Sequence, residues 1–512
     1  MSHNHFLSAA PRHWLAKLVM LVVVATPAWQ VWGAEFHVSP RGNALGDGGP
    51  NHPWDLQTAL DGAPGKDRQP RIRPGDAVWL HGGVYRGGFS SRLLGRLDAP
   101  ITVRQAPGER ATIECALIEG RGEPYFLVEG GHAIYWGFEV TCADLKRETT
   151  HTGSWPADIR RGGVLCRGSD VKFINLIVHD LGSGIGFWSE AEGGEIYGCL
   201  IYYNGWKGPE RGHGHGIYAQ NKDGEKRLVD NVIFNQFGYG IHCYGTEKAF
   251  LRGFHIEGNA GFNNGCLHKL TDHNPVIFVG GGAPVQGLTV SHNYIYGGSL
   301  SCGYPWGAPN QDVSITDNYI EGSLSVRHFL KVVATGNTLI ANDTLVGLQF
   351  ADKIDTSQYD WDHNHYFRPG GMYPPFNWQA GPKVQGGELD EWRAAAKLDA
   401  HSDLHAAAPP NAQGFVRPNR YEPGRAHIIV FNPGRTETVE VDLSAAMKVG
   451  QKYTIVSVQN VFGPPVCTGV YQGQAISLPM KPTPAAQPIG MAQFNLPVTE
   501  PAFGVFLAQP SP

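Results

Sequence analysis

One pattern recurs along the middle of this 512-residue chain and limits the folds that it can adopt. Its first form is an Asn between two short apolar stretches, and four successive copies are separated by 25, 19 and 27 residues. Its second form is Gly-Ile followed by alternating residues, with copies separated by 32 and 24 residues. The Asn copies are Asn293, Asn318, Asn337 and Asn364, preceded by the similar Asn231, and the Gly copies are Gly184, Gly216 and Gly240.

A repeat of about 24 residues with strand-like alternation and no helical period predicts a solenoid of short strands. One turn of such a solenoid cannot bury its apolar face alone, so neighbouring turns stack. An Asn tolerates the left-handed backbone of a tight turn and can bond to its neighbours, so the recurring Asn predict a ladder. A β-sandwich with coincidental spacing is the alternative interpretation.

The composition agrees with many short strands and tight turns. Gly supplies 67 of the 512 residues, while charged residues make up 17% and aromatic residues 11%. The aromatic content excludes a disordered chain, and the glycines keep no three-residue period, which excludes collagen. So much Gly also disfavours a long helical bundle. The net charge of −5 offers no basic surface for nucleic acid.

The N-terminus has the pattern of a secretory signal peptide over residues 1–34. Basic Arg12 and Lys17 precede a short apolar run, and the small residues Gly33 and Ala34 follow it. We expect cleavage and a secreted or periplasmic, soluble protein; an uncleaved membrane anchor is the alternative, although the run is short for one. The eight cysteines form no Cys-x-x-Cys pair, so we expect most of them to be buried core residues rather than zinc ligands.

Segments near the N-terminus carry a family resemblance. Residues 36–60, with Phe36-His37-Val38-Ser39-Pro40, and residues 73–103, with Arg73-Pro74-Gly75-Asp76, resemble the N-terminal region of secreted right-handed parallel β-helix proteins. This is the pectin-lyase-like superfamily, which includes polysaccharide lyases of the alginate lyase and chondroitinase B type. The resemblance implies an all-β chain with a right-handed parallel β-helix and an N-terminal cap over residues 35–370. That fold also hosts hydrolases, epimerases and non-catalytic proteins.

The sequence changes character after Phe367. Residues 371–414 are expected to form a linker with a short helix around Trp392, between Glu388 and Leu398. Residues 415–512 contain several segments typical of antiparallel strands and predict a small C-terminal β-sandwich module. The module would cap the solenoid end, assist sugar binding, or both, and capping is favoured because open solenoid ends need cover.

The richest polar stretch runs from Arg211 to Asn221. When the three Gly-Ile copies are aligned, alternate residues of neighbouring turns fall on one outward face, about 5 Å apart. This predicted face contains Trp188, Tyr218, Gln220, His242 and Tyr244, with His215 beside Tyr239. We also expect Gly265 to continue the alignment, which would bring His268 and Lys269 beside Tyr244.

This face suits sugar binding and proton transfer. Elimination in an acidic polysaccharide needs a base, a group that neutralises the uronate carboxylate, and an acid for the leaving oxygen. We assign the base to Lys269, His242 or His215, the acid to Tyr218 or Tyr244, and the neutralising role to Arg211. His213 completes the predicted catalytic set, and the predicted sugar-binding set is Trp188, Gln220, Asn221, His268, Arg327 and His328. The alternative is that some of these histidines only bond backbone groups in turns.

Arg327-His328 ahead of Gly336-Asn337 resembles a stretch of chondroitinase B-like lyases, although the fuller pattern of that family is not evident. The resemblance also implies calcium as the one cofactor, with candidate ligands Glu190, Glu192, Glu195 and Asp223. We therefore expect a monomeric polysaccharide lyase that cleaves an acidic polysaccharide. A glycoside hydrolase, for which no carboxylate pair is identified, and a non-catalytic polysaccharide-binding protein of exopolysaccharide assembly are the alternatives.

Overall fold

The computed structural model describes residue 1 and residues 33–511, apart from residues 64, 66–68, 117–124, 270–273, 306, 351–352 and 492–494. The predicted signal peptide lies outside the described residues except at its ends. Gly33–Pro512 form one compact unit. Within the described residues, no helix is long and apolar enough to cross a membrane.

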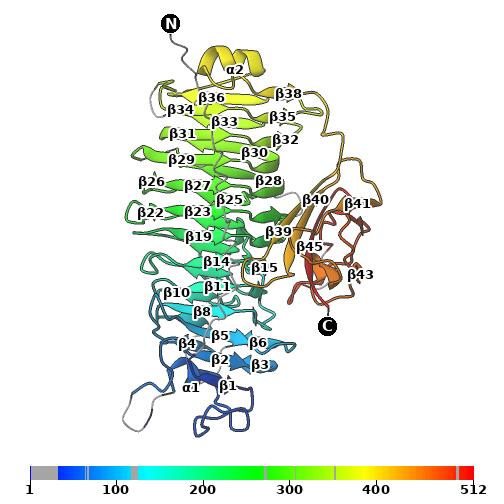
Figure 1. The fold of residues 1–512 in the computed structure, drawn as a ribbon. Helices are drawn as coiled ribbons and strands as arrows, with labels where there is room; N and C mark the ends of the chain where they lie inside the picture. The colour runs from blue at the N-terminus through cyan, green and yellow to red at the C-terminus, as the bar shows by residue number, and fades with distance from the viewer. Residues whose placement is uncertain are drawn as a thin grey trace. The chain divides into compact units, whose positions relative to one another are not determined.

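The chain winds into a right-handed parallel β-helix, in which each turn adds one strand to each of three parallel sheets (Figure 1). Right-handed connections between parallel strands follow from the twist of the strands themselves. The first sheet has twelve strands: β1 Glu35–Val38, β2 Ala77–Leu80, β5 Ile101–Gln105, β8 Ala133–Trp136, β11 Lys172–Ile174, β14 Glu195–Tyr197, β19 Lys226–Val229, β23 Phe254–Glu257, β27 Leu288–Ser291, β29 Asn310–Thr316, β31 Phe329–Thr335 and β34 Tyr359–Asp362.

The second and third sheets are joined, because β28 Tyr294–Cys302 and β30 Tyr319–Arg327 are long enough to run through both. The other strands of the second sheet are β3 Gly83–Arg86, β6 Ala111–Glu114, β9 Glu139–Thr141, β12 Ile177–His179, β15 Leu200–Tyr202, β20 Val232–Phe234, β24 Ala260–Phe262, β32 Thr338–Ile340, β35 His365–Phe367 and β38 Asp403–His405. The third sheet contains β4 Phe89–Ser91, β7 Phe126–Val128, β10 Val164–Cys166, β13 Ile185–Phe187, β18 Ile217–Ala219, β21 Ile241–Cys243, β25 Ile277–Val279, β33 Val346–Gln349, β36 Phe376–Ala380 and the antiparallel β37 Lys383–Gly387.

Inward-pointing side chains stack along the axis and form the core of the solenoid. Ile185, Ile217 and Ile241 lie in register on neighbouring turns and are fully buried. Burying such a side chain contributes about 1.5–3 kcal/mol, which a single turn could not obtain alone. The cysteines follow the same rule: all eight, every one in the described part of the chain, are free, and seven are buried. The prediction that most of them are core residues is therefore confirmed.

The recurring Asn form the expected ladder between the first and second sheets. The side-chain amide of Asn293 donates to Asn318 at 3.0 Å, and the amide of Asn318 donates to Asn337 at 2.9 Å. The ladder Asn do not themselves take the left-handed backbone. The residue before each one does, as at His292 and Asp317, with φ of +54° and +56°. The Asn are thus buried hydrogen-bonding groups rather than the turn residues that the sequence suggested.

Both ends of the solenoid are covered by short helices. Helix α1, Leu56–Leu60, buries Leu56 and Leu60 at the N-terminal end. Helix α2, Leu389–Ala396, covers the last turns, where Trp392 is fully buried and donates to Asp399 at 2.7 Å (Figure 1). The predicted boundary at residue 370 is wrong, because β36 and β38 continue the parallel sheets to residue 405.

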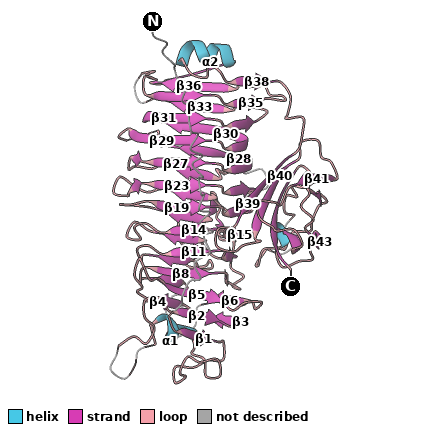
Figure 2. Ribbon diagram, in the orientation of Figure 1, coloured by secondary structure: helices cyan, strands magenta, loops and turns pink. Residues whose placement is uncertain are grey.

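The C-terminal segment folds into two antiparallel sheets that share a core. The larger sheet has the order β39-β40-β45-β42-β43 and the smaller one pairs β41 with β44. Figure 2 shows the short 3-10 helix Val458–Asn460 beside β43. Their bounds are β39 Gln413–Pro418, β40 Ala426–Phe431, β41 Thr438–Val441, β42 Lys452–Ser457, β43 Cys467–Val470, β44 Ile476–Pro479 and β45 Phe503–Pro510. We call residues 413–510 the C-terminal module.

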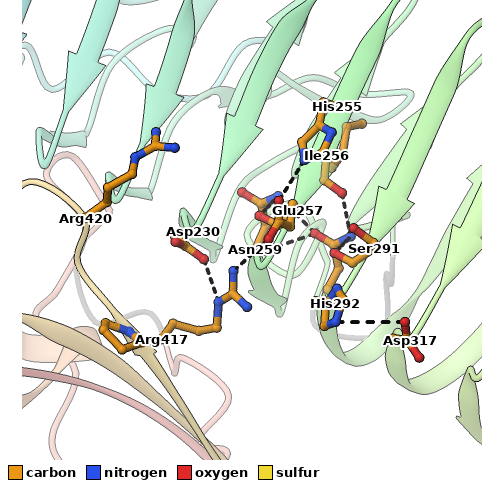
Figure 3. Close-up of polar contacts among 12 residues, drawn as sticks. Asp230, His255, Ile256, Glu257, Asn259, Ser291, His292, Asp317, Arg417 and Arg420 are labelled. Atoms are coloured by element: carbon orange, nitrogen blue, oxygen red, sulfur yellow. Dashed lines mark hydrogen bonds and ion pairs between the residues drawn. The ribbon is translucent and has the colours of Figure 1, made fainter. Parts of the chain in front are cut away.

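The module packs along the second sheet. The expectation that it caps the end of the solenoid is therefore wrong. Phe431 and Phe503 of the module share an apolar cluster with solenoid residues such as Tyr202 and Phe262. Beside this cluster, Arg417 is paired with Asp230 at 2.7 Å (Figure 3). The module buries the outward-pointing aromatic rings of the second sheet, while the two helices already cover the solenoid ends.

Candidate active site

The third sheet brings the predicted outward residues together. Strands β13, β18 and β21 are paired so that Gly186, Tyr218 and His242 lie side by side, as the alignment of the Gly-Ile copies predicts. The Tyr218 ring lies 5.4 Å from the His242 ring, edge to face. His215, just before β18, lies 4.5 Å from the same imidazole. This part of the predicted site is therefore one cluster.

A hairpin that interrupts the solenoid turns this face into a cleft. Between β15 and β18 the chain leaves the coil and forms β16, Trp206–Lys207, paired with β17, Gly212–His213. The hairpin and the sheet enclose about 370 Å³, a volume within the range of ligand pockets. The lining residues include Tyr125, Trp155, Leu165, Trp188, Trp206, Arg211, His213, His215 and Tyr218.

The two histidines of the sheet face form a hydrogen-bonded pair with fixed proton positions. The backbone N–H of Tyr239 donates to Nδ1 of His215 at 3.2 Å, so the proton of a neutral His215 is on Nε2. That Nε2 lies 3.2 Å from Nδ1 of His242 and donates to it. The proton of His242 is consequently on its Nε2, where no protein group of the described residues accepts it. His242 therefore carries an N–H donor on the outward face of the third sheet, beside Tyr218 at the edge of the cleft.

The surroundings keep this pair neutral. Burial is the main cause that lowers the pKa of His215, to about 3, and the nearby Arg211 acts in the same direction. Burial likewise lowers the pKa of His242 well below its ordinary value. A proton on His242 Nδ1 would also face the N–H of His215, which agrees with the direction of both shifts. Neither ring offers a free lone pair, so neither can serve as the base that the sequence suggested.

A second histidine, on the hairpin, has the opposite arrangement. His213 Nε2 lies 2.8 Å from the Glu210 carboxylate, which can only accept, so Nε2 carries the proton and Nδ1 has the lone pair. The ring is 2% exposed and stacks on Trp206 at 4.9 Å. Burial and Arg211 lower the pKa of His213, while Glu210 opposes them. His213 is thus neutral near pH 7 and has a carboxylate to stabilise its charged form.

Aromatic side chains flank these groups. The rings of Trp188 and Tyr218 are 5.6 Å apart, and Tyr244 stacks on His242 at 4.9 Å. Trp155, 42% exposed, covers Trp206 at 4.6 Å. Burial raises the pKa of Tyr218 and of Tyr244, so both phenols keep their protons at neutral pH and can donate them.

Two of the predicted sugar-binding residues have structural roles instead. Asn221 is fully buried, and its amide donates to the carbonyls of Gly224 and Arg252 at 3.0 and 2.7 Å. Gln220 is half-buried and donates to the carbonyl of Tyr244 at 3.1 Å, which joins neighbouring turns. Asn221 therefore belongs to a turn of the solenoid and not to the cleft.

The expected continuation of the sheet at Gly265 is wrong. Strand β25 places Phe278, not Lys269, beside His242. Residues 264–268 form a turn between β24 and β25, and Lys269 after it is exposed. A side-chain atom added to Gly212 of the hairpin would meet Cβ of His268 at 2.9 Å, so His268 lies against the hairpin rather than beside Tyr244. This register therefore excludes Lys269 as the base.

Arg327 and His328 lie further along the same sheet. The pairing from His242 through Phe278 and Ser301 reaches Ser325 three turns later, roughly 15 Å away at about 4.8 Å a strand. Arg327 lines a separate hollow of about 120 Å³ with Trp378. His328 occupies a turn with φ of +56°. Neither residue contributes to the cleft.

The four candidate calcium ligands do not gather at one place. Glu195 faces away from the cleft on the first sheet, where it is paired with Arg420 and accepts from the Tyr421 hydroxyl at 2.6 Å. Among the described residues, the one group of three side chains with ligand atoms within 4.8 Å of one another is Asp362, His363 and His401, near the far end of the solenoid. Among the described residues, those that line the cleft include no Asp or Glu, so they do not fit a calcium ion.

The sequence did not single out Glu210, Trp155 or Trp206 as part of the site. They lie on a hairpin and a loop that leave the repeat, so the alignment of turns could not place them. The sequence feature that could have indicated the pair is the three-residue spacing of Glu210 and His213, close to Gly208. A side-chain atom at Gly208 would meet His213 Nε2 at 2.9 Å, so this glycine keeps space for the imidazole.

The fold is that of a right-handed parallel β-helix. Similar solved structures include the pectate lyase Pel9A, with 16% identity, a TM-score of 0.37, and 70% of this chain and 79% of that chain covered. A rhamnogalacturonan lyase has 13% identity, a TM-score of 0.42 and coverage of 68% and 87%. XylC, solved with xylose, has 12% identity, a TM-score of 0.43 and coverage of 92% and 100%. No family model matches the sequence, and no curated protein matches it.

Proposed function

We propose that this chain is an exported polysaccharide lyase that cleaves an acidic polysaccharide by β-elimination in the third-sheet cleft. One observation carries the proposal: a carboxylate-bound histidine, a neutral histidine pair with an outward N–H, a protonated tyrosine and an arginine meet on aromatic walls. His213, His215, Tyr218 and Arg211 line the cleft, and His242 adjoins it through its bond to His215. They supply the base, donors and acid that elimination requires.

The base in this proposal is His213. Its Nδ1 removes the proton on the carbon α to the uronate carboxylate, and Glu210 stabilises the resulting imidazolium through Nε2–H. The electron pair of that C–H bond forms the new C=C bond, and the bond to the leaving oxygen breaks. Tyr218 gives its proton to that oxygen, which leaves an unsaturated uronate and a free hydroxyl. Proton exchange with solvent then restores both side chains.

Removal of the α proton becomes easier when a positive or hydrogen-bonding group neutralises the carboxylate of the substrate. Arg211 is exposed at the mouth of the cleft, and it is close enough to lower the pKa of His213, His215 and His242. The Nε2–H of His242 is a second donor, fixed by His215. A donor already aimed at developing charge costs little reorganisation in the transition state. Arg211 and His242 are therefore assigned to the carboxylate and the enolate oxygens.

Hydrolysis is less well supported at this place. A glycoside hydrolase would use two carboxyl groups about 5–9.5 Å apart on either side of the bond. Among the described residues that line the cleft there is no Asp or Glu, and the adjacent Glu210 is bound to His213. A non-catalytic sugar-binding protein would use the aromatic walls but would leave the two histidine arrangements without a role.

The direct test uses acidic polysaccharides, such as polygalacturonate, alginate and chondroitin sulfate, incubated with the chain from residue 35, with and without a chelator. We expect new ultraviolet absorbance from an unsaturated uronate, unchanged by the chelator. New reducing ends without that absorbance would support a hydrolase instead. Binding without either product would leave the sugar-binding alternative.

A further inference from the structure

A second and larger hollow lies between the second sheet and the C-terminal module. It encloses about 680 Å³, and its floor comes from β28 and β30 of the solenoid. Its opposite wall comes from Phe431, Pro433 and Arg435 of the module, at and just after the end of β40. None of the residues that line it belongs to the third-sheet cleft, so its chemistry must be considered separately.

The floor of this hollow contains a buried hydroxyl without a partner. Tyr319 is 9% exposed, its ring packs on Phe431 at 4.4 Å, and its Oη has no hydrogen bond among the described residues. Leaving such a group unpaired costs stability, so an unpaired hydroxyl in a native protein needs an explanation, and a bound ligand is one. Tyr319 lines the hollow, and a small shift of its ring on ligand binding would give Oη a ligand hydroxyl as its partner.

Beside Tyr319, the floor is made of small residues. Gly297, with φ of +63°, has nothing within 4 Å of the position that a side chain would take. Ser299 and Ser323 lie in register on neighbouring turns next to it. The ring of Tyr296, stacked on Phe503 at 4.5 Å, forms one side. An open backbone with hydroxyl groups and an aromatic wall suits the flat, hydroxyl-covered shape of a sugar ring.

The charged groups of the hollow nearly balance. Glu321 follows Tyr296 in register, and its burial raises the pKa of its carboxyl to about 7, while Arg435 opposes the rise. Arg435 is held by the turn that Asn432 closes through its bond to the Thr436 carbonyl at 2.8 Å. Asp343 also lines the hollow. Two carboxyl groups against one guanidinium give no attraction for a polyanion, whereas both kinds of group bind neutral hydroxyls.

We propose that this hollow is a second carbohydrate site, which binds a neutral oligosaccharide through Tyr319, Glu321 and Arg435 independently of the third-sheet cleft. The site would hold neutral stretches or neighbouring chains of a polysaccharide against the module. It does not depend on lyase chemistry, since none of the residues proposed for proton transfer touches it.

The test measures calorimetric binding of neutral gluco-, manno-, galacto- and xylo-oligosaccharides of six units to the chain from residue 35. We expect at least one of them to bind, and Tyr319→Phe and Glu321→Gln each to weaken it by fivefold or more. Tyr294→Phe is the matched control, because Tyr294 occupies the same strand position one turn earlier but does not line the hollow. That control and His213→Ala should bind as tightly as the parent chain.

Thermal unfolding of each variant separates lost binding from lost folding, and Glu321→Gln is conservative enough to keep the fold. Absence of binding to all four sugars would overturn the proposal. Equal binding by the Tyr319→Phe, Glu321→Gln and parent chains would overturn it too, as would loss of binding in His213→Ala, which would place the sugar in the cleft. Lyase activity is measured separately, so failure of one proposal leaves the other open to its own test.

Discussion

Nε2 of His215 lies 3.2 Å from Nδ1 of His242, and the backbone N–H of Tyr239 occupies the other nitrogen of His215. This relationship makes Nε2 of His242 a hydrogen-bond donor on the outward face of the third sheet, beside the cleft. We predict that His215→Phe, which fills the space of the ring but cannot fix the proton, lowers kcat/KM roughly 10²–10⁴-fold. Steady-state kinetics on a cleaved polysaccharide measure the effect, and Tyr239→Phe, which keeps the backbone N–H, is the control. Equal activity of His215→Phe and the parent chain would contradict the assigned proton positions.

The Glu210–His213 pair predicts a distinctive pH dependence. The base must be neutral, so activity is lost as the pH falls through the pKa of His213, which burial places below its ordinary value of 6.5. Glu210 raises that pKa, so Glu210→Gln should move the acidic limb of kcat/KM to lower pH and reduce kcat about 10²-fold or more. Glu192→Gln, at an acidic residue outside the cleft lining, is the control. A limb that stays in place in Glu210→Gln would show that another group is the base.

Neutral buried histidines also link stability to pH. The pKa of His215 is about 3 in the folded chain and about 6.5 in an unfolded one, so the unfolded chain binds the extra proton between these values. Stability should therefore fall as the pH drops from 6.5 toward 3, by up to ~1.4 kcal/mol per unit for this residue. Denaturant unfolding at several pH values measures the slope. His215→Gln should reduce the slope, and an unchanged slope would mean that His215 is charged in the fold.

The Asn ladder should make a large contribution to stability. Asn318→Ala removes the acceptor for both the backbone N–H and the side-chain amide of Asn293, at 2.9 and 3.0 Å. Leaving buried donors unpaired costs about 1–3 kcal/mol each, so we expect a loss of several kcal/mol. Denaturant unfolding measures the loss, and Asn411→Ala, at an exposed loop position, should change stability by less than about 0.5 kcal/mol. Similar losses in the two variants would be inconsistent with the ladder.

The attachment of the module to the solenoid depends on a partly buried ion pair. Asp230 is 7% exposed and paired with Arg417 at 2.7 Å. Arg417→Ala leaves that carboxylate unpaired, and we expect a cost of about 3–5 kcal/mol or detachment of the module. Limited proteolysis between residues 405 and 413 reports detachment. The double variant Arg417→Met with Asp230→Asn should recover most of the loss, and failure to recover would mean that packing and not charge holds the module.

The repeat made the fold and the central part of the cleft predictable. Alternation places every second residue of a strand on one face, and neighbouring turns share register, so the neighbours Tyr218 and His242 followed from two glycines. The same rule failed at Gly265, because the turn after β24 delays the next strand until Ile277. The length of a loop between two coils is not encoded in the periodicity of the strands.

The positions of residues outside the repeat could not be predicted from the sequence. His213 was part of the predicted catalytic set, but its partner Glu210 was not, because both lie on a hairpin whose antiparallel pairing leaves the solenoid and no alignment of turns includes it. The position of the module could not be predicted either, because Arg417 of the module and Asp230 of the solenoid, which form an ion pair, are far apart in sequence. The hollow that contains Tyr319 exists only because the two parts pack side by side.

In the proposed function, elimination depends on His213 as the base and Tyr218 as the acid. The most direct measurement follows the ultraviolet absorbance of unsaturated uronate when the parent chain, His213→Ala and Tyr218→Phe are incubated with the same acidic polysaccharides, with thermal unfolding as a check on folding. We predict that the parent chain produces the signal on at least one polymer, and that both variants fold but lose at least 99% of the rate. A signal that persists in the folded His213→Ala and Tyr218→Phe chains, or a parent chain that releases only saturated reducing ends, would contradict the account.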